Sequence, residues 1–462
     1  MSAGKYKPYP EYRDSEVEWL GDFPSNWEVE PSKKVLTLRR ELVGTDHASF
    51  QLLSLTLRGV ITRDISNGEG KIPAEFNSYQ IVSPDELIFC LFDIDETPRS
   101  IGLSFHEGMI TGAYNVYRTS PRYNPNYACF YFLHIDSFKG LKPFYTGLRK
   151  VVRADTFGTI KIPIPPLPEQ IQIAKFLDYE TAKIDELIEK QQELIALLKE
   201  KRQAVISHAV TKGLPPEAAQ KVGLNPHPPL KDSGIEWLGK VPEHWNVSPL
   251  KQHVDTINGF GFSSSHFQDE GVPFIRAGNI KKKSVTQPSI FLPEKIVSAY
   301  KRVILKKNDV VISMVGSDPK ILESAVGQVG IVPPSLAGAV PNQNVVIMRE
   351  KGTVLLKSYL FYTLCSSAYR NHLNVFSHKL ANQSIISSSL LAAAYFTFPN
   401  LKEQKTIVSF LDTEVVKFDS LTAKAKRTVG LLQERRTALI SAAVTGKIDV
   451  RDWQPPKERK AS

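Results

Sequence analysis

The chain has 462 residues, of which 42% are hydrophobic, so it can bury globular cores and does not have a disordered composition. Lysine and arginine outnumber aspartate and glutamate by 58 to 48, and the resulting net charge of +10 favours a polyanionic partner. Cys90, Cys129 and Cys365 are scattered and form no C-x-x-C pair, which argues against a disulfide framework or a zinc site. Because the first residues lack a signal-peptide pattern and no apolar run is long enough to span a membrane, we expect a cytoplasmic protein.

The opening motif of the chain recurs in its second half. Residues 14–21 read DSEVEWLG and residues 232–239 read DSGIEWLG. A proline and a tryptophan follow in each copy, as Pro24 and Trp27 and as Pro242 and Trp245. A repeat of this length is far too long for a solenoid and predicts two whole domains.

The predicted domains occupy residues 1–165 and 232–398. Strand-like segments bounded by Pro, Gly and Asn are found at 88–92 and 114–117. Residues 85–89 match 309–313, and residues 113–116 match 342–345. The remainder diverges, as expected for two modules that share a scaffold and recognise different targets.

Each domain is followed by a long predicted helix, at 166–213 and 399–447. Glu169-Gln170 and Glu403-Gln404 mark the two starts, and Gly213 and Gly446 mark the two ends. The helices align without a gap, and apolar residues recur every seven positions, which predicts a coiled-coil seam. The alternative is that each helix packs only on its own domain. The proposed seam residues are Leu177, Ile184, Leu187, Leu194, Leu198, Val205, Leu411, Phe418, Leu421, Leu432 and Leu439.

Two further segments have a biased composition. Residues 214–231 contain five prolines, which predicts a stiff, extended linker. Residues 448–462 form a short charged tail that we expect to be disordered.

No catalytic or metal-binding pattern is recognisable. The chain has no Asn/Asp-Pro-Pro-Tyr/Phe tetrapeptide, no phosphate-binding loop, no Gly-x-Ser-x-Gly turn and no histidine pair with metal-ligand spacing. Gly259-Phe260-Gly261-Phe262 is a lone glycine pair, which does not indicate a cofactor loop, and Asp93 and Asp95 are read as turn caps. We therefore assign no catalytic residue and no metal, and the sequence favours binding over catalysis.

The duplicated motifs resemble those of the specificity subunits of Type I restriction–modification systems. The resemblance rests on the Glu-Trp-Leu-Gly opening of each half, on residues 163–170 echoed by 399–404, and on residues 202–211 echoed by 436–446. It implies an α+β fold with two similar strand-rich mixed α/β domains, separated by two long antiparallel coiled-coil helices with an internal pseudo-two-fold. It also implies that each domain reads one half of a split double-stranded DNA target.

The same resemblance implies partners. Two methyltransferase subunits and, through them, translocase–nuclease restriction subunits would assemble on this chain, which would be a non-catalytic part of an endonuclease and DNA adenine methyltransferase. S-adenosylmethionine, ATP and Mg²⁺ would be bound by those partners. The outward faces of the helices and the Glu-Gln starts are candidate docking points, although the glutamates could equally serve as simple helix caps.

Residue type and loop context select the candidate DNA contacts, because Lys and Arg bind phosphates, Arg suits guanine, and Asn or Gln suits adenine. The candidates are Arg58, Arg63, Arg99, Arg149, Lys150 and Arg153 in the first domain, and Arg276, Asn279, Lys281, Lys282, Lys283, Lys379, Asn382 and Gln383 in the second. The last three lie in a polar segment at 377–389 that we expect to be a loop. The alternative for any one of them is a solvated surface charge.

Two other functional classes remain open from the sequence. One is a free-standing DNA-binding or adaptor protein without restriction partners. The other is a self-contained nuclease or methyltransferase with unrecognised motifs.

Overall fold

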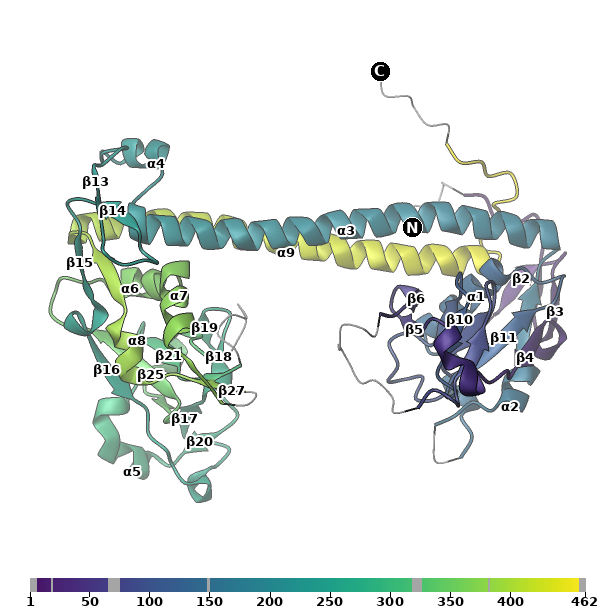
Figure 1. Ribbon diagram of the computed structural model, residues 1–462, viewed down its shortest axis with the longest axis horizontal. Coiled ribbons are helices and arrows are strands. Elements are labelled where there is room, and N and C mark those ends of the chain that lie inside the picture. Colours follow the sequence, from purple (N-terminus) through teal and green to yellow (C-terminus); the bar gives the residue numbers. More distant parts are fainter. Residues whose placement is uncertain are drawn as a thin grey trace. The chain divides into compact units, whose positions relative to one another are not determined.

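The computed structural model describes residues 6–17, 20–64, 75–147, 150–317, 326–380 and 383–456 (Figure 1). The fold divides into two compact units, one made of residues 1–192 and 426–462 and the other of residues 193–425. Each unit contains a strand-rich domain together with parts of both long helices. The second unit is therefore one continuous stretch of chain, whereas the first is closed by the C-terminal residues.

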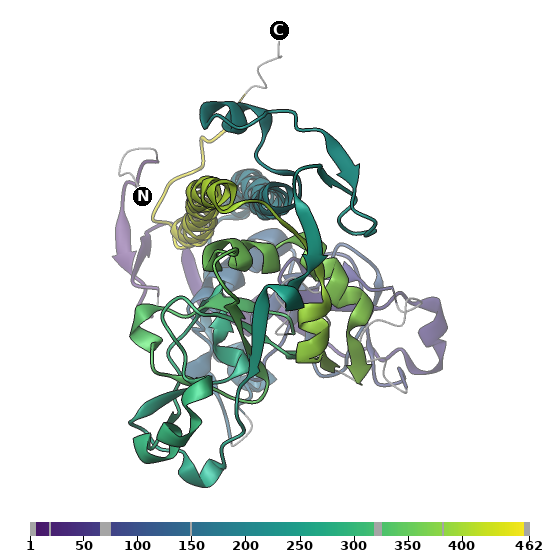
Figure 2. The same cartoon turned by 90° about the vertical axis from the view of Figure 1, so that its left-hand side faces the viewer.

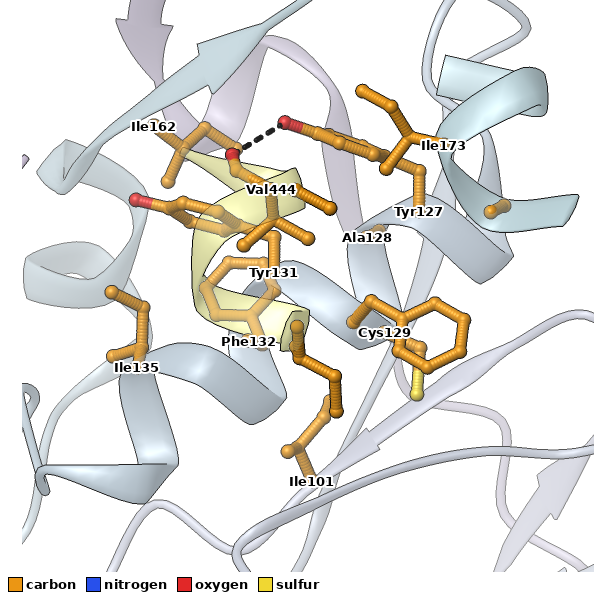
Figure 3. Packing of buried hydrophobic residues seen from close by; sticks show 14 of the residues in the cluster. Ile101, Tyr127, Ala128, Cys129, Tyr131, Phe132, Ile135, Ile162, Ile173 and Val444 are labelled. Carbon is orange, nitrogen blue, oxygen red and sulfur yellow. Dashed lines mark hydrogen bonds between the residues drawn. The ribbon is translucent and has the colours of Figure 1, made fainter. Parts of the chain in front are cut away.

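The first unit is built on an antiparallel sheet of order β4–β11–β8–β9. A buried cluster joins this sheet to α1, β12 and both long helices; Figure 3 shows Tyr127 and Phe132 of α1 beside Ile173 and Val444. The first unit contains β1 (Tyr12–Asp14), β2 (Asp22–Pro24), β3 (Glu28–Pro31), β4 (Leu36–Arg39), β5 (Leu53–Thr56), β6 (Gly59–Thr62), β7 (Gln80–Val82), β8 (Leu87–Phe89), β9 (Ile101–Leu103), β10 (Gly108–Ile110), β11 (Asn115–Thr119), α1 (Pro125–Ser137), α2 (Ala154–Thr159), β12 (Lys161–Ile164) and the start of α3 (Leu167–Lys212).

The second unit is built on a mixed sheet of order β16–β25–β21–β23–β19–β18. It contains α4 (Pro216–Lys221), β13 (Leu230–Asp232), β14 (Lys240–Pro242), β15 (Asn246–Pro249), β16 (Val254–Asn258), β17 (Val272–Ile275), β18 (Ile280–Lys281), β19 (Ser284–Val285), β20 (Phe291–Leu292), α5 (Glu294–Val297), β21 (Val310–Ser313), β22 (Val315–Gly316), β23 (Val329–Ile331), β24 (Val340–Pro341), β25 (Val345–Glu350), α6 (Lys357–Leu364), α7 (Ser367–Phe376), β26 (His378–Leu380), β27 (Gln383–Ile385), α8 (Ser388–Ala393), β28 (Tyr395–Phe398) and the start of α9 (Leu401–Val444).

Each sheet contains a buried carboxylate that pairs with an arginine of a neighbouring strand. Glu86 precedes β8 and lies 3.0 Å from Arg118 of β11, while Asp309 precedes β21 and lies 2.6 Å from Arg349 of β25. Glu86 is therefore the structural counterpart of Asp309, one residue away from the match made on the sequence. Once the arginines are superimposed, the match between residues 113–116 and 342–345 also shifts, by two positions.

The repeated opening motif forms the same turn in both units. Each copy lies between the two strands of an antiparallel hairpin, which is β1–β2 in the first unit and β13–β14 in the second. In the first copy the hydroxyl of Ser15 accepts a hydrogen bond from the backbone N–H of Val17, and in the second copy Ser233 accepts one from Ile235, each at 3.1 Å. The residue between each pair has a left-handed backbone: it is Glu16 in one copy, with φ +56°, and a glycine in the other.

The long helices pair in an antiparallel sense within each unit, as expected. In the first unit the start of α3 packs against the end of α9, and in the second the end of α3 packs against the start of α9. Asp185 pairs with Arg436 at 2.8 Å in the first unit, and Arg202 pairs with Asp419 at 2.9 Å in the second. These two ion pairs join equivalent positions, so the seam is duplicated together with the sequence.

The predicted seam was correct for the residues spaced by multiples of seven from Leu177 and Leu411, and wrong for Leu187, Leu194 and Leu421. Leu177, Ile184, Leu198, Leu411 and Leu439 are buried, and Val205, Phe418 and Leu432 are half-buried. Leu187, Leu194 and Leu421 are exposed by 48%, 42% and 49%. In the middle of α3, from residue 181 to residue 202, the buried and half-buried side chains recur at alternating intervals of three and four. They are Thr181, Ile184, Ile188, Gln191, Ile195, Leu198 and Arg202.

Each long helix ends against the tryptophan that follows an opening motif, Trp27 for α9 and Trp245 for α3. Gly446, with φ +70°, follows α9, and a Cβ at this position would lie 3.2 Å from the ring of Trp27 and 2.3 Å from Pro24. Gly213, with φ +92°, follows α3 and lies beside Trp245 with more space. The motif therefore forms part of the socket that receives a helix end.

Two segments are more ordered than expected. Residues 214–231 are not a plain extended linker, because they include α4 and bury Leu214 and Ala219 in the second core. Figure 2 shows α4 on one side of the helix pair and the green helices α6 and α7 on the other. The tail is not disordered from 448 onward: Ile448 and Val450 are buried, and the ring of Trp453 packs 5.2 Å from that of Phe176. Within the described ranges, no helix has both the length and the apolarity needed to cross a bilayer.

Candidate nucleic-acid interface

The β5–β6 hairpin of the first unit presents Arg58 at its tip. Arg58 is exposed and forms no ion pair with any described residue. The guanidinium of Arg99 donates hydrogen bonds to the carbonyls of Leu57, at 2.9 Å, and Ile101, at 2.8 Å. Burial lowers the pKa of Arg99. Arg99 thus holds the hairpin that carries Arg58, and two of its guanidinium nitrogens are used in these bonds to backbone oxygens.

The basic turn near residue 150 is partly neutralised by acidic neighbours. The ammonium of Lys150 lies 2.8 Å from Glu96 and 3.4 Å from Asp95. These hydrogen bonds, that of Glu96 first, raise the pKa of Lys150 to about 12. Arg153 at the start of α2 is exposed. Arg149 lies outside the described residues.

Arg63 lies in a different place, in a hollow of about 440 Å³ beside Phe50 and Phe76. Its side chain is half-buried, and its backbone N–H donates to the carbonyl of Leu52 at 2.8 Å. The structure thus brings Arg58 and Arg99 to one hairpin but does not gather all the basic candidates of the first unit into one patch.

Five candidates of the second unit follow one another between β17 and β19. Arg276 is exposed, and its backbone N–H donates to the side-chain oxygen of Asn279 at 2.9 Å, which closes a short turn. Lys281, Lys282 and Lys283 then form the hairpin between β18 and β19. No ion pair joins these three lysines to the described part of the chain.

Lys282 and Lys283 both have left-handed backbones, with φ +49° and +65°. A two-residue hairpin turn of type I′ has positive φ at both positions and usually uses Asn-Gly, because side chains with a Cβ disfavour that conformation. The turn places Lys282, which is exposed, and Lys283, which is half-buried, at the tip of the hairpin, where lysines can approach phosphates.

The remaining candidates lie near the β26–β27 hairpin. Lys379 belongs to β26 and Gln383 to β27; the two strands pair antiparallel with each other, and β27 also pairs antiparallel with β22. The expectation of a loop over residues 377–389 was therefore wrong, since this segment contains two strands and the start of α8. Asn382 lies outside the described residues, and the structure describes only the backbone of Lys379 and Gln383.

The sequence search missed another group of side chains in the second unit. Phe260 and Gln343 are both exposed and lie on adjoining loops at one end of the large sheet, near Arg276. The available signal was the run Asn342-Gln343-Asn344 just before a strand, which contains the amide side chains that suit adenine. In the sequence alone, this run indicated only a correspondence between the two halves of the chain.

The paired Glu-Gln helix starts are buried and bonded internally. One carboxylate oxygen of Glu169 accepts hydrogen bonds from the indole of Trp27, at 2.7 Å, and the hydroxyl of Tyr9, at 2.5 Å. The amides of Gln170 and Gln404 each donate to a backbone carbonyl five residues earlier. These side chains are neither exposed docking points nor simple helix caps, because they attach each helix start to its own domain.

The described ranges contain no group of three or more His, Cys, Asp or Glu residues placed to hold a metal ion. The thiols of Cys90, Cys129 and Cys365 are buried, and burial raises the pKa of Cys90 and that of Cys129, the latter to about 11. A buried thiol with a raised pKa is a poor nucleophile.

Comparison with known proteins places these features in context. The family model "Type I restriction modification DNA specificity domain" matches residues 100–197 and 242–428, more than half of the chain. The Type I restriction enzyme MjaVIII specificity subunit of Methanocaldococcus jannaschii is 28% identical over 300 residues, which are 64% of this chain and 64% of that protein. The EcoKI specificity subunit of Escherichia coli K12 is 27% identical over 215 residues, 46% of this chain and 44% of that protein. The chain thus aligns with less than two thirds of either relative.

A solved structure shares the fold. It comes from work on the "structural basis underlying complex assembly and conformational transition of the type I R-M system". It superimposes with a TM-score of 0.60 at 17% identity, over 91% of this chain and 98% of that one.

Proposed function

Since the chain belongs to the family of Type I restriction–modification DNA specificity domains, we propose that it is the subunit that reads the DNA target of such a complex. Each unit recognises one half of a bipartite double-stranded sequence. The chain itself carries out no chemical step, and we assign it no cofactor.

The duplicated scaffold with different exposed side chains is the observation that carries this proposal. A buried carboxylate paired with an arginine, the opening turn and the helix socket occur in both units. The hairpin residues differ: an exposed arginine stands at a hairpin tip in the first unit, and three successive lysines, two of them exposed, stand at a hairpin in the second. A common framework with different contact residues suits two half-sites of different sequence.

The partners follow from the same proposal. Two methyltransferase subunits would bind the chain, and the restriction subunits would bind through them. S-adenosylmethionine, ATP and Mg²⁺ would be held by those subunits. The length of α3 and α9 would set the spacing between the half-sites.

Genome-wide mapping of methylated bases, with and without this chain, tests the proposal. We expect one bipartite motif to lose its methylation when the chain is deleted and to regain it when the chain is restored. Purification of the tagged chain should recover a methyltransferase at two copies per chain. An unchanged methylation pattern, or DNA cleavage by the purified chain alone, would refute the proposal.

A further inference from the structure

Four loops of the second unit meet at one end of its large sheet. The backbone N–H of Phe260, just after β16, donates to the carbonyl of Pro341 at 3.0 Å. The N–H of Asn342 donates to the carbonyl of Ile275, the residue before Arg276, at 2.8 Å. The N–H of Met314 donates to the carbonyl of Asn344 at 2.8 Å. These bonds fix side chains from distant parts of the sequence at one place.

Gln343 stands at the apex of a turn that is held at both ends. The N–H of Val345 donates to the carbonyl of Asn342 at 3.0 Å, and the N–H of Asn344 donates to the side-chain oxygen of Asn342 at 3.2 Å. Asn342 itself is buried. Gln343 is exposed, and no described residue forms a hydrogen bond with its side chain. Its amide donors and acceptor are therefore presented to solvent by a rigid backbone.

The glycines of the facing loop provide the space that this arrangement needs. A Cβ on Gly259 would lie 2.1 Å from the carbonyl oxygen of Asn342, so no larger residue fits there. A Cβ on Gly261 would lie 3.2 Å from the side-chain oxygen of Gln343. The Gly-x-Gly pair, which has no role as a cofactor loop, is explained by this close approach.

An aromatic ring and a guanidinium complete the surface. The ring of Phe260 is 40% exposed and lies 4.3 Å from that of Tyr300 and 5.0 Å from that of Phe262, which limit its movement. Arg276 is exposed and forms no ion pair with a described residue. An exposed amide, an apolar ring and an unpaired guanidinium are the groups that contact adenine, the thymine methyl and guanine in the major groove.

We infer that Gln343, Phe260 and Arg276 form the base-reading surface of the second unit, with Gln343 pairing with an adenine of its half-site. The inference rests on the proposed function and adds the residues that determine specificity. Lys281, Lys282 and Lys283, on a separate hairpin, would contact phosphates and contribute no sequence preference.

Selection of binding sites by the purified full-length chain from a randomised DNA duplex pool tests the inference. The wild type should select a two-part motif. Gln343→Ala should lose its preference for adenine at one base pair of one half-site by about ten- to hundred-fold. Gln343→Glu should move that preference toward cytosine, since a carboxylate accepts a hydrogen bond from the cytosine amino group. Gln287→Ala, at another exposed glutamine of the same unit, should select the wild-type motif.

The outcomes separate the inference from the proposed function. If the wild type selects no motif, the proposed function fails. If the wild type selects a motif and both Gln343 variants select the same one, or if the preference weakens evenly over the whole half-site, the inference is overturned. Because Gln343 is exposed at a turn apex, both variants should retain the wild-type melting temperature, and this measurement identifies any effect due to unfolding.

Discussion

At the scale of single residues, the two copies show which parts of the repeat are structural. Glu169 and Glu403 begin equivalent helices, and both are buried, but their partners differ. Glu169 accepts hydrogen bonds from Trp27 and Tyr9, whereas Glu403 lies 3.1 Å from the imidazole of His244. A buried carboxylate needs hydrogen-bonding partners, and the two units supply them from different side chains.

The turn of the opening motif gives a prediction about backbone strain. Glu16 has φ +56°, in the place where the second copy has Gly234, with φ +70°. A residue with a Cβ is disfavoured in this conformation by about 1 kcal/mol. Glu16→Gly should therefore raise the free energy of unfolding of the full chain by about 0.5 kcal/mol after the entropy of glycine is counted.

Gly234→Ala is the matched change and should lower the free energy of unfolding by about 1 kcal/mol. Urea denaturation followed by circular dichroism measures both variants. If neither substitution shifts the urea concentration at the midpoint of unfolding, the turn carries no strain.

The buried ion pair gives a second prediction. Asp309 is fully buried between Arg349, at 2.6 Å, and Lys357, at 3.5 Å. Replacing it with Ala removes the carboxylate that neutralises the half-buried Arg349 and Lys357, which costs about 3 kcal/mol or more of stability. Asp255, which pairs with Lys351 at 3.5 Å on the surface, is the control, and Asp255→Ala should change stability by less than about 1 kcal/mol. Comparable losses for the two variants in thermal denaturation would contradict this assignment.

At the scale of elements, the repeat predicts the bounds of the long helices but not the register of the seam between them. Their bounds could be read from the Glu-Gln starts and the glycine stops because these signals are local. The register of the seam could not be read from the sequence, because leucines lie both in the buried seam and on the exposed flank of α3. Ile188 and Ile195 complete the seam, while Leu187 and Leu194 lie on the exposed flank. The alternating four–three spacing is visible only when buried Thr181 and half-buried Gln191 and Arg202 are counted with the apolar residues.

A pair of substitutions tests this register. Ile184→Ala should lower the free energy of unfolding by about 2–4 kcal/mol, because it leaves a cavity in a buried seam. Leu187→Ala, three residues later and 48% exposed, should lower it by less than about 1 kcal/mol. Thermal unfolding of the full chain measures both. A larger loss of stability in Leu187→Ala than in Ile184→Ala would show that Leu187 lies in the seam.

Other elements depend on contacts that no local pattern reveals. α1 and α4 were not predicted, and the tail was expected to be disordered, yet Trp453 packs on Phe176 and Tyr179. Such segments are ordered by the surfaces they cover rather than by their own propensity. The candidate site was limited in the same way: residue type selected Arg276, but only the folded loops bring Phe260 and Gln343 beside it. The DNA contacts selected from the sequence stay predictions.

At the scale of the whole molecule, the proposed role of the helices as a spacer can be measured. Adding one turn of four residues to both helices, after Gln191 in α3 and after Ala425 in α9, lengthens each by about 6 Å. Such an insertion disturbs a coiled-coil seam only locally. If the helices set the distance between half-sites, the methylated motif should gain one or two base pairs of spacing, at about 3.4 Å each, with its specified bases unchanged.

Mapping of methylated sites in cells that carry the lengthened chain reads out this prediction. An equal number of substitutions at the same places, without insertion, is the control. New specified bases at constant spacing would contradict the spacer role.

The division of the chain between the units has a consequence for biosynthesis. Residues 193–425 form one unit without interruption, whereas the other needs Leu439, Ile440 and Val444 to complete a core begun by residues far upstream. A ribosome adds roughly 5–20 residues per second, so the earlier half waits on the order of tens of seconds for its last core residues. The half that leaves the ribosome first is therefore the last to be completed, and during that interval its unfinished core is the surface most in need of a chaperone.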